Sequence, residues 1–286
     1  MDNRESLQVH DASIIKIHID LEDLNNYDSR MSTNFVRRTT RILVLNPNSS
    51  ASMTHGVEEA IRGMNLPQSV EIFTYTAPSE SPASINDGDD VAKSERVVFH
   101  NLEETGILRD YDAVLVACFS VHPLVDRIAD AYPHLVVTGI FEAGILAALS
   151  LLPHVINTWG IVTTGKYWEK HLSDGVHEFL GGGSSNSRFA GVETTGLNAG
   201  DFHGGVDPAE IRRRLREATK RLLDRHARAV IMGCAGMAGL EDIIREVATE
   251  ERGVQGGKDL LVIDGVKAGI GLLEQGVRNK RMFQRA

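Results

Sequence analysis

Two cysteines, Cys118 and Cys234, are the residues whose types and positions suggest chemistry in this 286-residue sequence. Each ends a short apolar run and precedes a further segment with helical character, which is the order of a strand followed by a helix. The carboxyl ends of parallel strands form the ligand-binding edge of an α/β sheet. Two cysteines are too few for a disulfide framework or a four-thiolate zinc site. They are therefore buried filler, one disulfide, or reactive thiols.

A pair of thiols on opposite faces of a carbon atom can move a proton across it without a cofactor. One sulfur removes the Cα hydrogen as a thiolate, and the other delivers a proton to the opposite face. We expect the N–H groups of the next helix to lower each thiol pKa from about 8.5 towards neutrality. The reaction also needs hydrogen-bond donors for an enolate-like oxyanion. Small polar residues at the same strand ends are of the right type, although each alone is equally typical of a helix cap or turn: Asn46, Asn48, Ser49, Ser120, Thr163 and Thr164.

The order and spacing of these segments repeat along the chain. Asn46 precedes Cys118 by 72 positions, and Thr163 precedes Cys234 by 71. A duplicated α/β unit would explain both the order and the spacing, with one thiol at the sheet edge of each half. Facing halves would then place the two thiols on opposite sides of one cleft.

The elements that must position these residues follow an α/β pattern. From Arg41 onward, short runs rich in Val and Ile alternate with amphipathic stretches, which is typical of parallel sheets covered by helices. Strands are predicted at 41–46, 70–75, 113–118, 135–139, 160–164, 229–233 and 260–264. Helices are predicted at 53–64, 91–105, 142–152, 208–226 and 240–250, and the Gly-rich stretches 181–187 and 253–257 are predicted to be surface loops.

Composition excludes several other classes of protein. The formal net charge is −9, with 30 Lys and Arg against 39 Asp and Glu, which argues against nucleic-acid binding and against docking to anionic membranes. No apolar run is long enough to span a bilayer and the N-terminus lacks a signal-peptide core, so we expect a soluble, cytoplasmic protein. Residues 1–40 are predicted to be a flexible extension, or to add an edge strand near 13–21.

Several segments together resemble the Asp/Glu/hydantoin racemase superfamily, and most closely its hydantoin and allantoin racemase branch. They are Arg41–Ser50 (RILVLNPNSS), Ala117–Ser120 (ACFS), Gly139–Ala143 (GIFEA), Gly160–Thr164 (GIVTT) and Gly233–Met237 (GCAGM). The resemblance spans about residues 41–280. It implies two pseudo-symmetric α/β domains with the active site in the cleft between them: residues 41–140 with about 262–286, and residues 141–261. It also implies racemisation without a cofactor or metal, with Cys118 and Cys234 as acid and base.

The resemblance also implies which residues line the substrate pocket: Asn46, Phe119, Ser120, Ala235 and Gly236, bordered by Thr163 and Thr164, with Asn48, Ser49 and His122 as further candidates. Two features depart from the family pattern. Val121-His122-Pro123 stands where Asp-Pro-Gly is common, and Phe141 stands where Gly is frequent. His122 is interpreted as a surface residue of a helical first turn, with ligand contact or thiol tuning as the alternatives. Glu142 is interpreted as a structural residue that caps its helix, with a position facing the cleft as the alternative.

The predicted function is racemisation of a cyclic ureide, either a 5-substituted hydantoin or allantoin. An amino-acid racemase or maleate-type isomerase is the alternative within enzymes, although free carboxylates call for Arg or Lys at the cleft and the strand ends contain almost none. A non-catalytic sensor of a small ligand is the alternative outside enzymes. The predicted partner is a small-molecule substrate, with self-association into a homo-oligomer also possible.

Overall fold

Two sheets of parallel strands organise the chain, and the computed structural model describes residues 7–9, 12–17, 39–154, 157–182 and 186–284. The first sheet holds the parallel strands β3 (Thr40–Asn46), β4 (Val70–Thr76), β5 (Ala113–Val116) and β6 (Val136–Gly139). The second holds β7 (Thr158–Thr163), β8 (Phe189–Thr194), β9 (Ala227–Gly233) and β10 (Leu261–Asp264), in the order β10-β9-β7-β8. The expectation of an α/β protein with parallel sheets is confirmed.

An edge strand from the N-terminal segment extends the first sheet. β2 (Ala12–Ile17) pairs antiparallel with β4, and β1 (Leu7–Val9) pairs with β2, which gives the order β1-β2-β4-β3-β5-β6. Of the two expectations for residues 1–40, the added edge strand therefore applies to this segment. The other positions before residue 39 lie outside the described residues.

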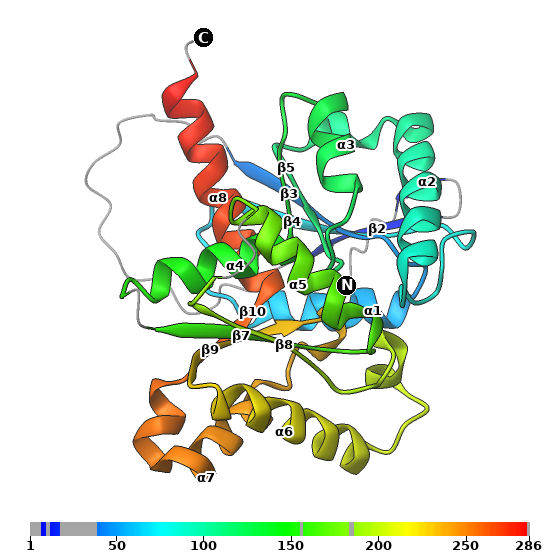
Figure 1. Cartoon of the computed structure of the whole chain (residues 1–286). Coiled ribbons are helices and arrows are strands. Elements are labelled where there is room, and N and C mark those ends of the chain that lie inside the picture. Colours follow the sequence, from blue (N-terminus) through cyan, green and yellow to red (C-terminus); the bar gives the residue numbers. More distant parts are fainter. Residues whose placement is uncertain (1–6, 10–11, 18–38, 155–156, 183–185, 285–286) are drawn as a thin grey trace, which may run out of the picture.

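Helices fill the space between the sheets and cover their outer faces (Figure 1). They are α1 (Ala51–Arg62), α2 (Gly88–Thr105), α3 (Leu124–Ala131), α4 (Ile140–Leu151), α5 (Tyr167–Phe179), α6 (Pro208–Asp224), α7 (Glu241–Asp259) and α8 (Gly265–Phe283), with short 3-10 turns η1 (Ile107–Asp110), η2 (Ala199–His203) and η3 (Ala235–Met237). After Asp264 the chain returns to the first sheet, because α8 packs against β5 and β6.

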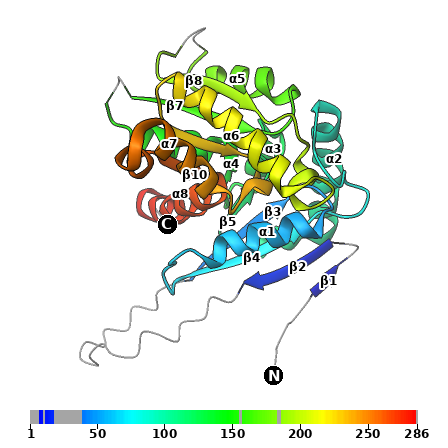
Figure 2. The same ribbon diagram turned by 90° about the horizontal axis from the view of Figure 1, so that it is seen from below.

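Successive side chains along a strand point to opposite faces of its sheet, so the two faces pack into different apolar cores. Ile42 and Val44 of β3 join a core cluster that also includes Trp159 and Ile231 of the second sheet, so this core connects the two sheets. Leu43 and its alternate neighbours instead pack under α2 and α3. The outer face of the second sheet packs under α6 and α7, which Figure 2 shows from below.

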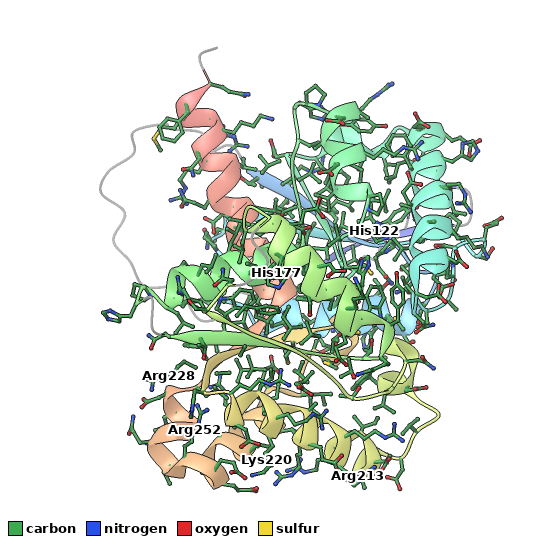
Figure 3. The ribbon with its side chains drawn as sticks, viewed as in Figure 1. His122, His177, Arg213, Lys220, Arg228 and Arg252 are labelled. Carbon is green, nitrogen blue, oxygen red and sulfur yellow. The ribbon has the colours of Figure 1, made fainter. Side chains whose placement is uncertain are left out.

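Charged residues of α6 lie on its outer side. Arg213 contacts Glu210 and Glu217, and Lys220 pairs with Glu251 of α7. Figure 3 shows Arg213 and Lys220 at this outer surface. Because these cations are paired with carboxylates, the segment does not form a basic face for nucleic acid.

Several predicted elements differ from the observed ones. β8, α3, α5 and α8 were not predicted. The stretch 253–257 was predicted to be a surface loop, but it lies within α7, where only Gly253 leaves the helical conformation, at φ 75°. Gly permits this positive φ without steric cost, so the helix is interrupted there and continues.

Gly233 is tightly enclosed where β9 reaches the end of β7. A Cβ at this position would lie 2.8 Å from Ile161 Cγ2 and Thr163 Cβ and 2.9 Å from the Val162 carbonyl oxygen. Such contacts include backbone, which cannot swing aside. The strand that delivers Cys234 therefore requires glycine at its last residue.

We expect Gly233→Ala to lower the free energy of unfolding by about 1–3 kcal/mol, because the added methyl group overpacks the strand end. The matched control is Gly271→Ala on the exposed side of α8, where a Cβ would meet nothing within 4 Å. That change should raise stability by about 0.5–1 kcal/mol, since Ala is the better helix former. Urea unfolding of both variants checks the pair, and equal effects of the two changes would contradict the packing argument.

Candidate active site

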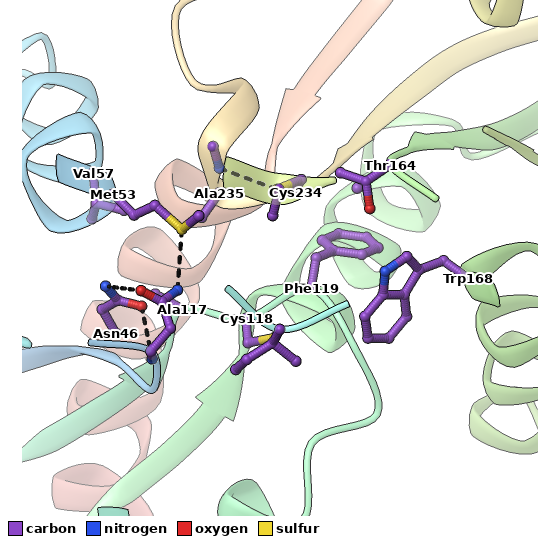
Figure 4. Close-up of a pocket in the computed structure, with 15 residues that line it drawn as sticks. Asn46, Met53, Val57, Ala117, Cys118, Phe119, Thr164, Trp168, Cys234 and Ala235 are labelled. Carbon is purple, nitrogen blue, oxygen red and sulfur yellow. Dashed lines mark hydrogen bonds between the residues drawn. The ribbon is translucent and has the colours of Figure 1, made fainter. Parts of the chain in front are cut away.

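Cys118 and Cys234 lie on the wall of one pocket, between the carboxyl ends of the two sheets. Both thiols are free and partly buried. Figure 4 shows them on opposite sides of the pocket. Its lining consists of Asn46, Asn48, Met53, Val57, Ile85, Ala117, Cys118, Phe119, Thr164, Trp168, Ala199, Gly233, Cys234, Ala235 and Gly236.

The pairing register of neighbouring strands determines where the two thiols lie. Leu45 of β3 pairs with Val116 of β5, and Cys118 follows two residues later. Thr163 of β7 pairs with Gly233 of β9, and Cys234 follows directly. The Thr163 hydroxyl donates a 2.6 Å hydrogen bond to the Gly233 carbonyl, which fixes this second strand end. Each thiol therefore follows a strand that is paired with its neighbour up to the edge of the sheet.

Burial raises the pKa of both thiols, so the expected lowering towards neutrality is wrong. Desolvation raises the pKa of Cys118 to about 12, with a hydrogen bond from Ser120 opposing it and the charges of Cys234 and Glu142 adding to it. Desolvation likewise raises the pKa of Cys234 to about 11, although the backbone N–H groups of Gly236 and Met237 oppose it. The physical reason is local geometry. α3 begins only at Leu124, and only the short turn η3 follows Cys234, so few helix N–H groups reach either sulfur.

Few donors bond directly to the sulfurs. The Ser120 hydroxyl donates to Cys118 Sγ at 3.4 Å, and the Gly236 N–H donates to Cys234 Sγ at 3.3 Å. Each thiol therefore accepts a hydrogen bond from the residue two positions along the chain. A thiolate formed on either side would be held by that donor.

The Asn46 amide is committed to its own network and is not a free oxyanion donor. Its Nδ2 donates to Asn48 Oδ1 and Thr54 Oγ1, both at 3.0 Å, and its Oδ1 accepts the Asn48 N–H. This network shapes the loop from β3 to α1. Within the described part of the chain, the Asn48 Nδ2 group donates to the thioether of Met53 alone, at 3.2 Å. A thioether is a weak acceptor, so the Asn48 amide is the donor that a substrate oxygen can recruit most readily.

The structure brings together eight of the expected residues and leaves four outside the lining. On the pocket wall are Asn46, Asn48, Cys118, Phe119, Thr164, Cys234, Ala235 and Gly236. Ser120 reaches the site through the Cys118 sulfur, and Thr163 is bound to Gly233. The Ser49 hydroxyl donates to the Ser81 carbonyl.

His122 is buried, so the interpretation as a surface residue is wrong. Its Nε2 hydrogen-bonds with the Ser94 hydroxyl at 3.0 Å, and its Nδ1 accepts the Leu124 N–H at 3.3 Å. Burial lowers its pKa to about 3, so the ring is neutral at physiological pH. His122 thus ties α2 to the start of α3 (Figure 3) and does not line the pocket.

Seven lining residues were missed by sequence reasoning: Met53, Val57, Ile85, Ala117, Trp168, Ala199 and Gly233. Met53 and Val57 carry a signal that could have found them, because they are four residues apart on one face of the predicted first helix. Trp168 stands four residues after Thr164, but α5 was not predicted. In Figure 4 the rings of Phe119 and Trp168 lie on one side of the pocket, with Met53 and Val57 on the other.

The pocket is uncharged and narrow. None of its 15 lining residues is Asp, Glu, Lys, Arg or His. The cavity has about 30 Å³ of space, enough for one or two water molecules. A five-membered ring is larger than this, so the walls must separate before a substrate enters.

The described residues lack two features that would indicate other classes of protein. They contain no group of three or more His, Cys, Asp or Glu side chains able to hold a metal ion. None of their helices combines the length and apolar character needed to cross a membrane.

Comparison with known proteins agrees with this geometry. Residues 42–273 match the sequence model of the Asp/Glu/Hydantoin racemase family. An uncharacterized protein of Schizosaccharomyces pombe is 35% identical over 83% of this chain and 92% of its own length. The hydantoin racemase of Paenarthrobacter aurescens is 30% identical over 70% of this chain and 79% of its own. The allantoin racemase of Klebsiella pneumoniae superposes with a TM-score of 0.66 at 26% identity, covering 84% of this chain and 89% of that one.

The family match covers both strand ends that carry thiols and every lining residue of the pocket. The superposition with the allantoin racemase extends over most of this chain, and the sequence match to the hydantoin racemase extends over 70% of it. This chain therefore belongs to the Asp/Glu/hydantoin racemase family and is an isomerase.

Proposed function

We propose that this enzyme racemises a neutral cyclic ureide, a 5-substituted hydantoin or allantoin, by proton transfer between Cys118 and Cys234. The observation that carries the proposal is a pair of thiols on one cavity whose lining has no charged side chain. A cyclic ureide has no free carboxylate, so it needs no Arg or Lys partner. An Asp or Glu substrate would bury its carboxylates there without a counter-ion, at a cost of several kcal/mol per charge.

The proton balance of the reaction is simple. One cysteine, as thiolate, takes the Cα proton, and the electron pair of the broken C–H bond moves to the adjacent carbonyl to form an enolate. The other cysteine, as thiol, gives its proton to the opposite face of Cα and becomes the thiolate. Substrate and product differ only in configuration, and the two sulfurs have exchanged protonation states.

Named donors in the pocket support the enolate step. The Asn48 Nδ2 group donates to a thioether, which is a weak acceptor, and the backbone of Ala235 and Gly236 lies beside Cys234. Hydrogen bonds in such a dry site stabilise developing negative charge more strongly than hydrogen bonds in water. The aromatic rings of Phe119 and Trp168 give the planar ureide ring an apolar surface.

We further propose a reducing compartment, such as the cytoplasm, as the place of action. The mechanism needs one thiolate and one thiol, and a disulfide between Cys118 and Cys234 would remove both groups. Oxidation would therefore inactivate the enzyme.

Replacing either thiol tests the two-cysteine mechanism. We expect Cys118→Ser and Cys234→Ser each to lower racemisation at least 100-fold, because a serine hydroxyl is a far poorer acid and base at neutral pH. Each variant should still exchange Cα–H for deuterium from the one enantiomer that faces its remaining thiol, and the two variants should prefer opposite enantiomers. Proton NMR in heavy water and optical rotation measure the two quantities. Full racemisation by both single variants would exclude this mechanism.

A substrate panel tests the neutral-ligand assignment. In the same NMR experiment, Cα–H loss should occur with hydantoins or allantoin and should be absent with aspartate and glutamate, while maleate should not isomerise. Exchange confined to the acidic amino acids would instead identify an amino-acid racemase. Binding of a ureide without any exchange, unaffected by blocking both thiols, would identify a sensor.

The raised thiol pKa values predict alkaline activation. The base is the deprotonated sulfur and burial raises its pKa to about 11 or 12, so the thiolate fraction is small at neutral pH and grows as pH rises. We expect kcat/KM to rise close to tenfold per pH unit between pH 7 and 9. A hydantoin methylated on the nitrogen between its two carbonyls removes the competing ionisation of the substrate. A rate that is constant over this range would contradict the burial of the thiols.

A further inference from the structure

Glu142 lies in the first turn of α4, at the same sheet edge as Cys118. Gly139, three residues before it, pairs with Val116, two residues before Cys118. The neighbouring rings of Phe119 and Phe141 meet edge to face, with centroids 5.5 Å apart. The segment that carries the thiol and the segment that carries the carboxylate are therefore in direct contact.

The Glu142 carboxyl group is buried and incompletely bonded. Among the described residues, its Oε2 is enclosed and has no hydrogen-bond partner. The side chain folds back over Gly139, where a Cβ would collide with Oε2. A carboxyl oxygen without a partner is costly to bury as an anion, and a residue kept there for capping alone would accept hydrogen bonds with both of its oxygens.

The environment of Glu142 allows it to change charge near neutral pH. Burial raises its pKa to about 7, with the backbone N–H groups of Glu142 and Gly139 opposing this and Asp126 of α3 adding to it. At the N-terminus of α8, Lys267 is engaged by Glu241 and Asp264. The ionised Glu142 in turn raises the pKa of Cys118, whereas the groups that act on Cys234 do not include it.

We propose that Glu142 is a positioning residue that makes the two thiols unequal: its negative charge holds the proton on Cys118 more tightly, so Cys234 is the sulfur that loses its proton more readily in the free enzyme. The inference rests on the two-thiol function proposed above. It assigns the first proton to leave the pair to the Cys234 side of the cavity, and the residue that sets this order is a carboxylate that does not line the pocket. Glu142 acts on the reaction only through Cys118.

Competitive alkylation of the two cysteines tests this assignment without any substrate. Iodoacetamide reacts with the thiolate. The ratio of the Cys118 alkylation rate to the Cys234 alkylation rate, measured by peptide mass spectrometry, therefore reports which thiol loses its proton more readily. In the unaltered enzyme this ratio should fall about three- to tenfold as pH rises from 6 to 9, with a midpoint near 7. In Glu142→Gln it should stay constant at its low-pH value.

Glu103→Gln is the matched control, because Glu103 is exposed on α2 and the change removes one negative charge from the surface. It should keep the pH dependence of the unaltered enzyme. A ratio that does not change with pH in the unaltered enzyme overturns the proposal even if Glu142→Gln fails to fold. Equal pH profiles for Glu142→Gln and Glu103→Gln also overturn it.

Racemisation is measured separately on the same samples. A pH-dependent labelling ratio in a protein that racemises no ureide would leave the Glu142 assignment intact and refute the proposed function. Racemisation by a protein whose labelling ratio does not change with pH would support the proposed function and refute the Glu142 assignment.

Discussion

The register between neighbouring parallel strands determines where the chemistry of this protein can occur. β3 pairs with β5, and β7 pairs with β9, each up to the last residues before a loop. Cys118 and Cys234 follow those pairs, so a shift of register in either sheet would move a sulfur along the sheet edge. Gly233 and the Thr163–Gly233 hydrogen bond hold the second register with very little free space. The repeated spacing in the sequence follows from this arrangement, because in each half about 70 residues separate the ends of two strands that lie side by side in the sheet.

Desolvation is the second constraint, and it acts on substrate choice and on catalysis together. A lining without charged side chains favours a neutral ring over a dicarboxylate. Desolvation also raises the pKa of both sulfurs, so each is a strong base once deprotonated. A strong base suits a carbon acid that is flanked by a carbonyl and an amide nitrogen. The low thiolate population at neutral pH is the corresponding disadvantage.

Sequence reasoning predicted most of the parallel strands and the position of both cysteines after strand ends, because both depend on local patterns. The apolar runs that end at Asn46, Cys118 and Gly233 mark buried parallel strands without help from the rest of the chain. β8 was missed because Gly191, at φ 105°, weakens its strand pattern. The thiol pKa values and the burial of His122 could not be predicted in the same way. They depend on which distant elements, such as α2 with Ser94, pack over a side chain.

The small volume of the cavity has a consequence for successive turnovers under the proposed function. After one turnover the sulfurs have exchanged protonation states, so the enzyme is ready only for the enantiomer it has just made. To start again on the first enantiomer, a proton must return from one sulfur to the other. If the proton returns within the pocket, the space for one or two water molecules limits its path to a very short water chain. Under the proposed function, the protonation state of the two sulfurs would therefore depend on which enantiomer was released last. At high substrate concentration, this proton return, and not proton transfer at carbon, would limit the rate of turnover.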